Sequence, residues 1–156
     1  MTQRISHYIA IAATLALGTL YPGAAHAQSG PKAEEAVALV KAAVAHIGAV
    51  GEAKAYEDFT KDHEHWVKGE YYIFCHSLEG TNLAHGGNAG LVGKNVLAFK
   101  DPDGVEVNVK LIEKVKAENS GWVKYRWPNP VTKKVEPKVI YVEKINNALC
   151  GSGYYE

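Results

Sequence analysis

The chain has 156 residues, and its 17 Lys and Arg balance 17 Asp and Glu, so it carries no formal net charge when histidine is neutral. A balanced charge argues against nucleic acid as a general partner, because a nucleic-acid-binding domain needs a basic face. It leaves room for a local basic pocket that binds a small anion.

The first 27 residues have the pattern of a secretory signal peptide. Arg4 precedes an apolar stretch of 13 residues, 8–20, and the sequence Ala25-His26-Ala27 follows as a cleavage site. The stretch is shorter than the roughly 20 residues that a membrane-spanning helix needs. The pattern predicts a cleaved leader, with an uncleaved membrane anchor as the alternative. Residues 28–156 are then expected as one domain, periplasmic or secreted.

The next 40 residues or so are predicted to be mainly helical. Apolar residues recur every three or four positions, which indicates a helix from about Pro31 to the stop signals Gly48 and Gly51: Val37, Val40, Val44, Ile47. A shorter helix is expected over 52–59. The polar segment 61–70 is predicted to be a loop, in which Trp66 either covers a pocket or closes a small core.

The period then changes to that of strands. Strands are predicted at 71–77, 81–85, 121–127, 138–145 and 148–155, with a helix at 105–118 between the second and the third. The last three strands follow one another without a helix between them and are expected to be antiparallel neighbours. The prediction is an α+β fold with a five-stranded antiparallel sheet and helices packed on it.

The only two cysteines, Cys75 and Cys150, both lie in the expected mature chain. In an exported protein such a pair predicts one disulfide bond. The alternative is two buried free thiols, which pack like small apolar groups.

Four short motifs resemble a known family, the second type of single Cache domain, found in bacterial chemoreceptors and sensor kinases. They are EGT at 79–81, LVGKN at 91–95, GWVKYRWPNP at 121–130 and PKVIYV at 137–142. The resemblance implies a PAS-like sheet of strand order 2-1-5-4-3, preceded in the chain by a long N-terminal helix. It also implies extracytoplasmic binding of a small organic molecule, often a carboxylate. In that order the strands of Cys75 and Cys150 are neighbours, which makes their bridge geometrically feasible.

The main ligand-binding hypothesis rests on Tyr125, Trp127, Lys138 and Tyr141. A small carboxylate needs a cation and hydroxyl donors in a partly dry pocket with an apolar wall, and these residue types supply all three. Lys138 and Tyr141 are three residues apart and do not share a face of a regular strand. A bulge would therefore be required, or Lys138 at the entrance of the strand. The alternative is a packed aromatic face with a solvated lysine.

Three further residues are expected near the ligand. Phe74 and His76 share one face of the first strand with Tyr72, and His85 follows the second strand. His85 either donates a hydrogen bond to a carboxylate or caps the glycine-rich loop that follows it. His63 and His65 are interpreted as part of a solvated loop, because the other ligands of a metal site are missing.

The sequence thus predicts a periplasmic module that binds or senses a small organic acid, without catalysis and without a cofactor. The chain ends after the fifth strand, so we expect a partner such as a membrane receptor or sensor to read the bound state. The alternatives are a structural or interaction partner of a membrane sensor or respiratory complex and, ranked lower, an exported enzyme with His76 or His85 as its base. The long N-terminal helix would permit a homodimer.

Overall fold

The computed structural model describes residues 28–156, and the predicted leader lies outside the described residues. Five strands form one antiparallel sheet in the order β4-β3-β7-β6-β5. They are β3 (Phe74–Ser77), β4 (Asn82–His85), β5 (Ser120–Pro128), β6 (Val135–Ile145) and β7 (Ala148–Tyr155). Counted along the chain this order is 2-1-5-4-3, which confirms the predicted order and the α+β class.

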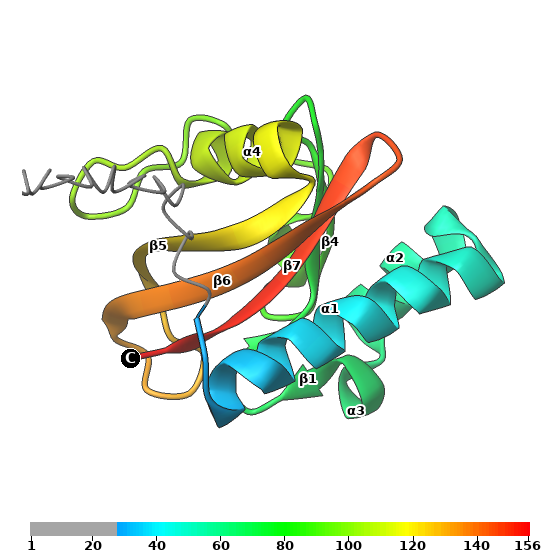
Figure 1. Cartoon of the computed structure of the whole chain (residues 1–156), viewed down its shortest axis with the longest axis horizontal. Helices are drawn as coiled ribbons and strands as arrows, with labels where there is room; N and C mark the ends of the chain where they lie inside the picture. The colour runs from blue at the N-terminus through cyan, green and yellow to red at the C-terminus, as the bar shows by residue number, and fades with distance from the viewer. Residues whose placement is uncertain (1–27) are drawn as a thin grey trace, which may run out of the picture.

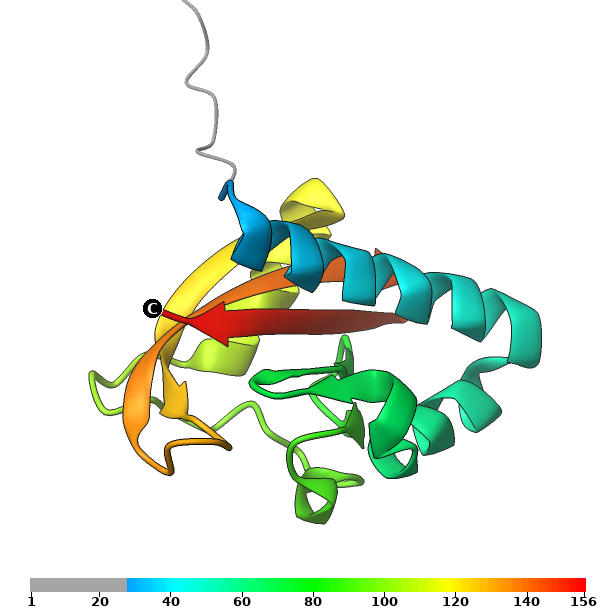
Figure 2. The same cartoon turned by 90° about the horizontal axis from the view of Figure 1, so that it is seen from below.

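Helix α1 (Pro31–Val50) covers one face of the sheet, as Figures 1 and 2 show. Proline near its first position suits a helix start, and the helix ends at Gly51, whose φ of 83° favours glycine. The buried side differs from the expected valine stripe, because Val37 and Val44 are only half-buried. Half of the buried residues are alanines, which lets the helix approach the sheet closely: Ala33, Ala36, Leu39, Val40, Ala43, Ile47.

The segment expected as a loop at 61–70 has regular structure. After α2 (Glu52–Lys61) the chain forms the short helix α3 (His63–Trp66) and a hairpin of β1 (Val67–Lys68) and β2 (Tyr71–Tyr72). Asp62 caps α3 by accepting a hydrogen bond from the backbone N–H of His65. Trp66 is buried against Phe59, with ring centroids 4.6 Å apart, and so belongs to the core. Among residues 28–156, no helix has the length and apolar character to cross a bilayer.

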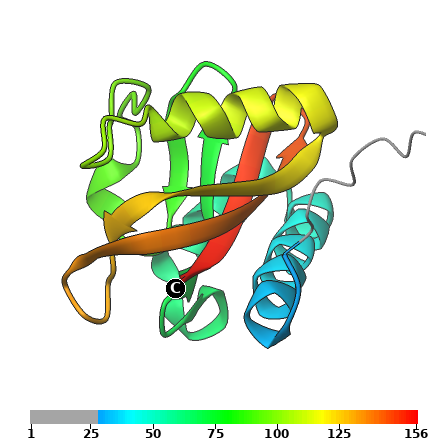
Figure 3. The same cartoon turned by 60° about the vertical axis from the view of Figure 1, so that its left-hand side comes forward.

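Helix α4 (Val107–Glu118) covers the opposite face of the sheet. Figure 3 shows α4 and α1 on the two sides of the strands. Val107, Leu111 and Val115 of α4 are buried against this face. Between β4 and α4 the chain forms a long loop with the short helix η1 (Ala89–Leu91). The loop and α4 together bound the space over this face, and the candidate site lies there.

Cys75 of β3 and Cys150 of β7 are directly opposite each other in the ladder and form a disulfide bond. Both are completely buried in the apolar cluster beneath α1. The expected bridge is therefore present in the structure, and it ties two strands that are far apart in sequence.

Candidate ligand-binding site

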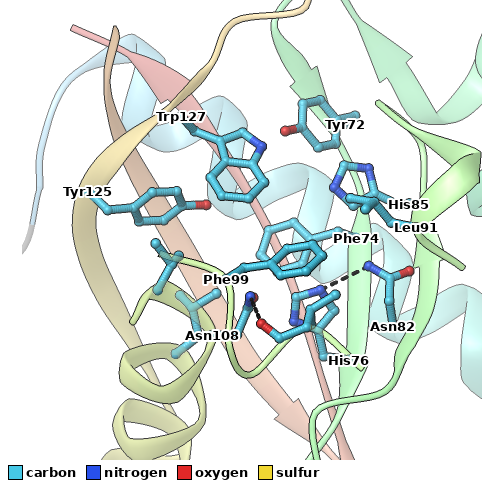
Figure 4. A pocket seen from close by; sticks show the side chains of 13 residues that line it. Tyr72, Phe74, His76, Asn82, His85, Leu91, Phe99, Asn108, Tyr125 and Trp127 are labelled. Carbon is cyan, nitrogen blue, oxygen red and sulfur yellow. Dashed lines mark hydrogen bonds between the residues drawn. The ribbon is translucent and has the colours of Figure 1, made fainter. Parts of the chain in front are cut away.

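A cavity lies between the sheet and the segment that runs from η1 into α4. Its inner part has a volume of about 20 Å³, enough for roughly one water molecule. A wider depression of about 340 Å³ lies outside it and shares four lining residues with it: Tyr72, His85, Leu91, Trp127. Figure 4 shows the side chains around the inner part. Because the two spaces share these residues, they adjoin each other, and the wider depression is called the mouth below.

Strand alternation brings the polar side chains of the cavity to one face. Tyr72, Phe74 and His76 are two residues apart and line it from β2 and β3. His85 is paired with Phe74 and lines the cavity from β4. On the neighbouring pair of strands, Tyr125 of β5 is paired with Lys138 of β6.

Lys138 is a buried cation, with its side chain only 1% exposed. Its Nζ donates a hydrogen bond to the Tyr72 hydroxyl at 2.7 Å and lies 4.0 Å and 4.7 Å from the ring centres of Tyr72 and Tyr155. Among the described residues, no carboxylate lies within 4.0 Å of Nζ. Burial lowers the pKa of Lys138 from 10.5 to about 7, and the more distant carboxylate of Glu70 opposes this only in part. The ammonium is therefore held mainly by π-faces and one hydroxyl.

His85 is a neutral donor at the mouth. Its Nδ1 accepts a hydrogen bond from the backbone N–H of Asn88 at 2.9 Å, which assigns the proton to Nε2. Burial, followed by the nearby His76 and Lys138, lowers the pKa of His85 to about 3. His85 therefore caps the loop through Nδ1, and its Nε2–H is the donor that the ligand-binding hypothesis requires.

His76 lies deeper, at the inner end, and is 4% exposed. The Asn82 amide nitrogen lies within hydrogen-bond distance of its Nε2, at 3.0 Å. Burial lowers the pKa of His76 to about 4, which keeps the ring neutral at pH 7. Its Nδ1 has no hydrogen-bond partner among the described residues.

Tyr125 and Trp127 close the side formed by β5, as Figure 4 shows. Their rings meet edge to face with centroids 5.9 Å apart. Burial, and then the neighbouring Tyr72, raises the pKa of Tyr125 well above 10, so its hydroxyl remains a donor. Tyr125 thus provides an O–H group and Trp127 an apolar wall.

Tyr141 was expected in this cluster, and the structure places it elsewhere. Odd-numbered residues of β6 face α1, so Tyr141 packs against Trp122 with ring centroids 5.3 Å apart. Its hydroxyl donates to Glu143 at 3.3 Å. The ladder of β6 is regular from residue 135 to residue 145, and the bulge that could have put Lys138 and Tyr141 on one face is absent from it.

Sequence reasoning missed two residues that shape the surroundings of Lys138. Tyr72 accepts the hydrogen bond of Lys138, and the ring of Tyr155 also lies against the ammonium. The sequence indicated a position for Tyr72, because it alternates with Phe74 and His76 and so shares their face of the strand. Tyr155 could be found only through its pairing with Lys138 across β6 and β7.

Comparison with known proteins finds one matching family model and relatives that are sensor proteins. The family model described as Single Cache domain 2 matches residues 11–151. A sensor histidine kinase of Rhizobium johnstonii is 31% identical over 86 residues, and a methyl-accepting chemotaxis protein of Pseudomonas putida is 28% identical over 86 residues. Each match covers 54% of this chain but only 18% and 16% of the relative, so the chain spans less than a fifth of either.

Solved structures agree on the fold. A methyl-accepting chemotaxis protein from Vibrio parahaemolyticus superposes with a TM-score of 0.70 at 24% identity, over 78% of this chain and 86% of that one. A second structure, described as showing carboxylic acid recognition by a Cache chemosensory domain, has a TM-score of 0.67 at 26% identity, over 80% and 92%.

Proposed function

Because this chain belongs to the family of type 2 single Cache domains, a family of sensor domains, we propose that it binds a short organic carboxylate outside the cytoplasm. A similar Cache chemosensory domain is described as recognising carboxylic acids. The disulfide between Cys75 and Cys150 supports an oxidising compartment, where such bonds persist. The signal-peptide pattern of residues 1–27 agrees with export.

The observation that carries the proposal is Lys138. A buried ammonium is costly unless an anion pairs with it. The part of the chain that the structure describes offers Lys138 a hydroxyl and two aromatic rings but no carboxylate within 4.0 Å. Lys138 itself lines neither the inner cavity nor the mouth, whereas Tyr72, which accepts its hydrogen bond, lines both. A carboxylate beside Tyr72 would supply negative charge close to the ammonium. It would also favour the charged form of Lys138 and so raise its pKa.

The neighbouring donors fit the same ligand. The Tyr72 hydroxyl accepts from Lys138, and Tyr72 lines both the inner cavity and the mouth. His85 Nε2–H and the Tyr125 hydroxyl are further donors that line the cavity. A carboxylate has about four acceptor positions on its two oxygens. A cation with neutral donors around it is therefore suited to an anion and poorly suited to an amine.

The size of the cavity bears on how the ligand enters. The inner 20 Å³ is too small for even a two-carbon acid, while the mouth of 340 Å³ is not. Leu91 and Phe99 border the inner part from the segment between β4 and α4, and neither is fully buried. We infer that these two side chains move outward when the ligand binds and that the sheet residues stay in place.

Thermal shifts with a panel of acids of two to six carbons, matched amines and amino acids test the proposal. An acid present at a hundredfold excess over its dissociation constant should raise the free energy of unfolding by about 2.7 kcal/mol. Tyr125→Phe removes one donor and should weaken binding roughly tenfold. The matched control Tyr141→Phe removes a hydroxyl from the opposite face and should leave the affinity unchanged. If no acid stabilises the protein, the binding proposal is wrong and a role as an interaction partner gains support.

A further inference from the structure

The two edges of the five-stranded sheet differ in what lies beside them. At the β4 edge, the backbone N–H of Asn82 donates to the carbonyl of Lys94, and the N–H of Gly93 donates to the carbonyl of Asn82. The loop after β4 therefore occupies that edge. At the other edge β5 is the last strand of the sheet, and β6 is its only neighbouring strand among residues 28–156. All nine residues of β5 pair with β6 without a register shift, so its outer edge is regular.

Alternation fixes which backbone groups of β5 point outward. The N–H of Arg126 donates to Asp101 Oδ2 at 3.1 Å, so the even-numbered residues of β5 direct their backbone groups away from β6. Within the described part of the chain, the backbone groups of Trp122 and Lys124 have no hydrogen-bond partner on that side. Asp101 closes the edge at Arg126, and the open stretch precedes it. Such a row of unpaired groups is a template for an added strand.

A groove of about 430 Å³ lies beside this open stretch, between β5 and α4. Figure 1 shows α4 running alongside β5. Val123 and Ala117 give the groove apolar surface, and its charged side chains are three lysines and two glutamates: Lys110, Lys114, Lys124, Glu113, Glu118. None of the lining residues also lines the inner cavity or the mouth. An added strand points alternate side chains to opposite faces, so every second one would lie at the groove.

The charges of the edge indicate the kind of partner. β5 carries two basic side chains, Lys124 and Arg126, and no acidic one. Their contacts with Glu156, at 2.6 Å, and Asp103, at 3.8 Å, are exposed ion pairs, which contribute little and exchange readily. Side chains directly opposite in an antiparallel pair attract when their charges differ and repel when they are alike. An acidic strand therefore suits this edge, whereas a second copy of β5 would bring its own basic side chains.

We propose that the outer edge of β5 binds an extended acidic segment of a partner protein, which joins the sheet as a further antiparallel strand. Its residues opposite Trp122 and Lys124 exchange backbone hydrogen bonds with them. Acidic side chains at these positions lie beside Lys124 and Arg126. The residue opposite Val123 directs an apolar side chain to the groove. The partner segment thus alternates acidic and apolar residues, and this binding is separate from the proposed carboxylate function.

The probe is a capped heptapeptide, Glu-Val-Glu-Val-Glu-Val-Glu, added to the ¹⁵N-labelled protein. Without peptide, the amides of Trp122 and Lys124 should exchange quickly with solvent, whereas those of Val123 and Tyr125, which face β6, should exchange slowly. The peptide should slow the first two about tenfold or more.

Two methylated peptides form a matched pair. N-methylation of the third residue, a glutamate, removes a donor that faces β5 and should abolish binding. N-methylation of the fourth residue, a valine, removes a donor that faces away from β5. This second peptide should bind within about threefold of the unmethylated one, because its pairing groups are intact.

Charge reversal tests the chemistry of the partner. Lys124→Glu should weaken binding of the glutamate peptide about tenfold or more and should allow binding of the peptide Lys-Val-Lys-Val-Lys-Val-Lys. Lys116→Glu is the matched control, because Lys116 is an exposed lysine of α4 that does not line the groove. The control makes the same change in net charge and should leave the affinity within about threefold.

Each outcome bears on the inference. If the glutamate peptide leaves the exchange of Trp122 and Lys124 unchanged, or if the two methylated peptides bind alike, strand addition at this edge is wrong. If Lys124→Glu alters the affinity no more than Lys116→Glu, the acidic preference is wrong. If these amides become protected as the protein alone is concentrated and sedimentation shows a dimer, the edge binds a second copy, which also overturns the inference. Carboxylate binding in the cavity stands or falls separately, by thermal shifts.

Discussion

Replacing Lys138 by methionine should stabilise the protein at neutral and acidic pH while it abolishes ligand binding. Lys138 is buried without a carboxylate partner, and burial lowers its pKa from 10.5 to about 7. At 1.36 kcal/mol for each pKa unit, the charged form costs roughly 5 kcal/mol in the folded state. Methionine has a similar length and no charge to bury, so the variant avoids this cost.

The dependence on pH has a definite sign. Below pH 7 the ammonium is charged in both the folded and the unfolded chain, and the full cost is present. Between pH 7 and pH 10.5 the unfolded chain holds a proton that the folded chain has lost, so the stability of the unmodified protein rises with pH. The cost falls from roughly 5 kcal/mol at pH 6 to roughly 2 kcal/mol at pH 9. The difference in unfolding free energy between Lys138→Met and the unmodified protein should shrink by about 3 kcal/mol over this range.

Urea unfolding of both proteins at pH 6, 7.5 and 9 measures the difference between their free energies of unfolding. Only this difference, and not the stability of either protein, is needed for the test. Lys124→Met is the matched control, because Lys124 lies on the neighbouring strand with its side chain exposed beside Glu156. Its effect should stay within about 0.5 kcal/mol at every pH. A Lys138→Met variant that is less stable than the unmodified protein at pH 6, or a difference that does not change with pH, would refute the argument that Lys138 is an unpaired buried charge.

Three further predictions concern ligand binding and the frame of the site. Because the anion binds the charged form of Lys138, carboxylate affinity should fall by up to about tenfold for each pH unit above 7, and titration calorimetry should show proton uptake. Removing the disulfide with Cys75→Ser and Cys150→Ser should lower the free energy of unfolding by roughly 4 kcal/mol, since the bridge spans 75 residues; equal urea midpoints with and without the bridge would contradict this. In Gly151→Ala the new Cβ would lie 2.7 Å from Cζ of Phe74. The variant should lose about 1–3 kcal/mol and bind acids more weakly, and unchanged melting and affinity would show that the ring can move aside.

Much of the fold follows from local sequence signals. The β-prone residues of 71–77 and 138–145 indicated strands, and the proline and glycines around α1 indicated a helix. In the first segment the structure has two strands, β2 and β3, because Ile73 interrupts the predicted one. Segment 61–70 was wrongly expected to be a loop, because a four-residue helix and two-residue strands give no periodic pattern long enough to recognise. The buried side of α1 was also misjudged, since its alanines give a weak hydrophobic signal.

The candidate site divides in the same way. The sequence by itself determined which neighbours share a face, and it placed Phe74 with His76 and Tyr125 with Trp127, because the side-chain period of a strand is two. Only the tertiary structure decided which face α1 covers and which face α4 leaves hollow. That choice put Lys138 beside Tyr72, which is 66 residues away in sequence, and turned Tyr141 toward α1. Contacts between distant strands depend on sheet order and helix packing, and no local pattern encodes them.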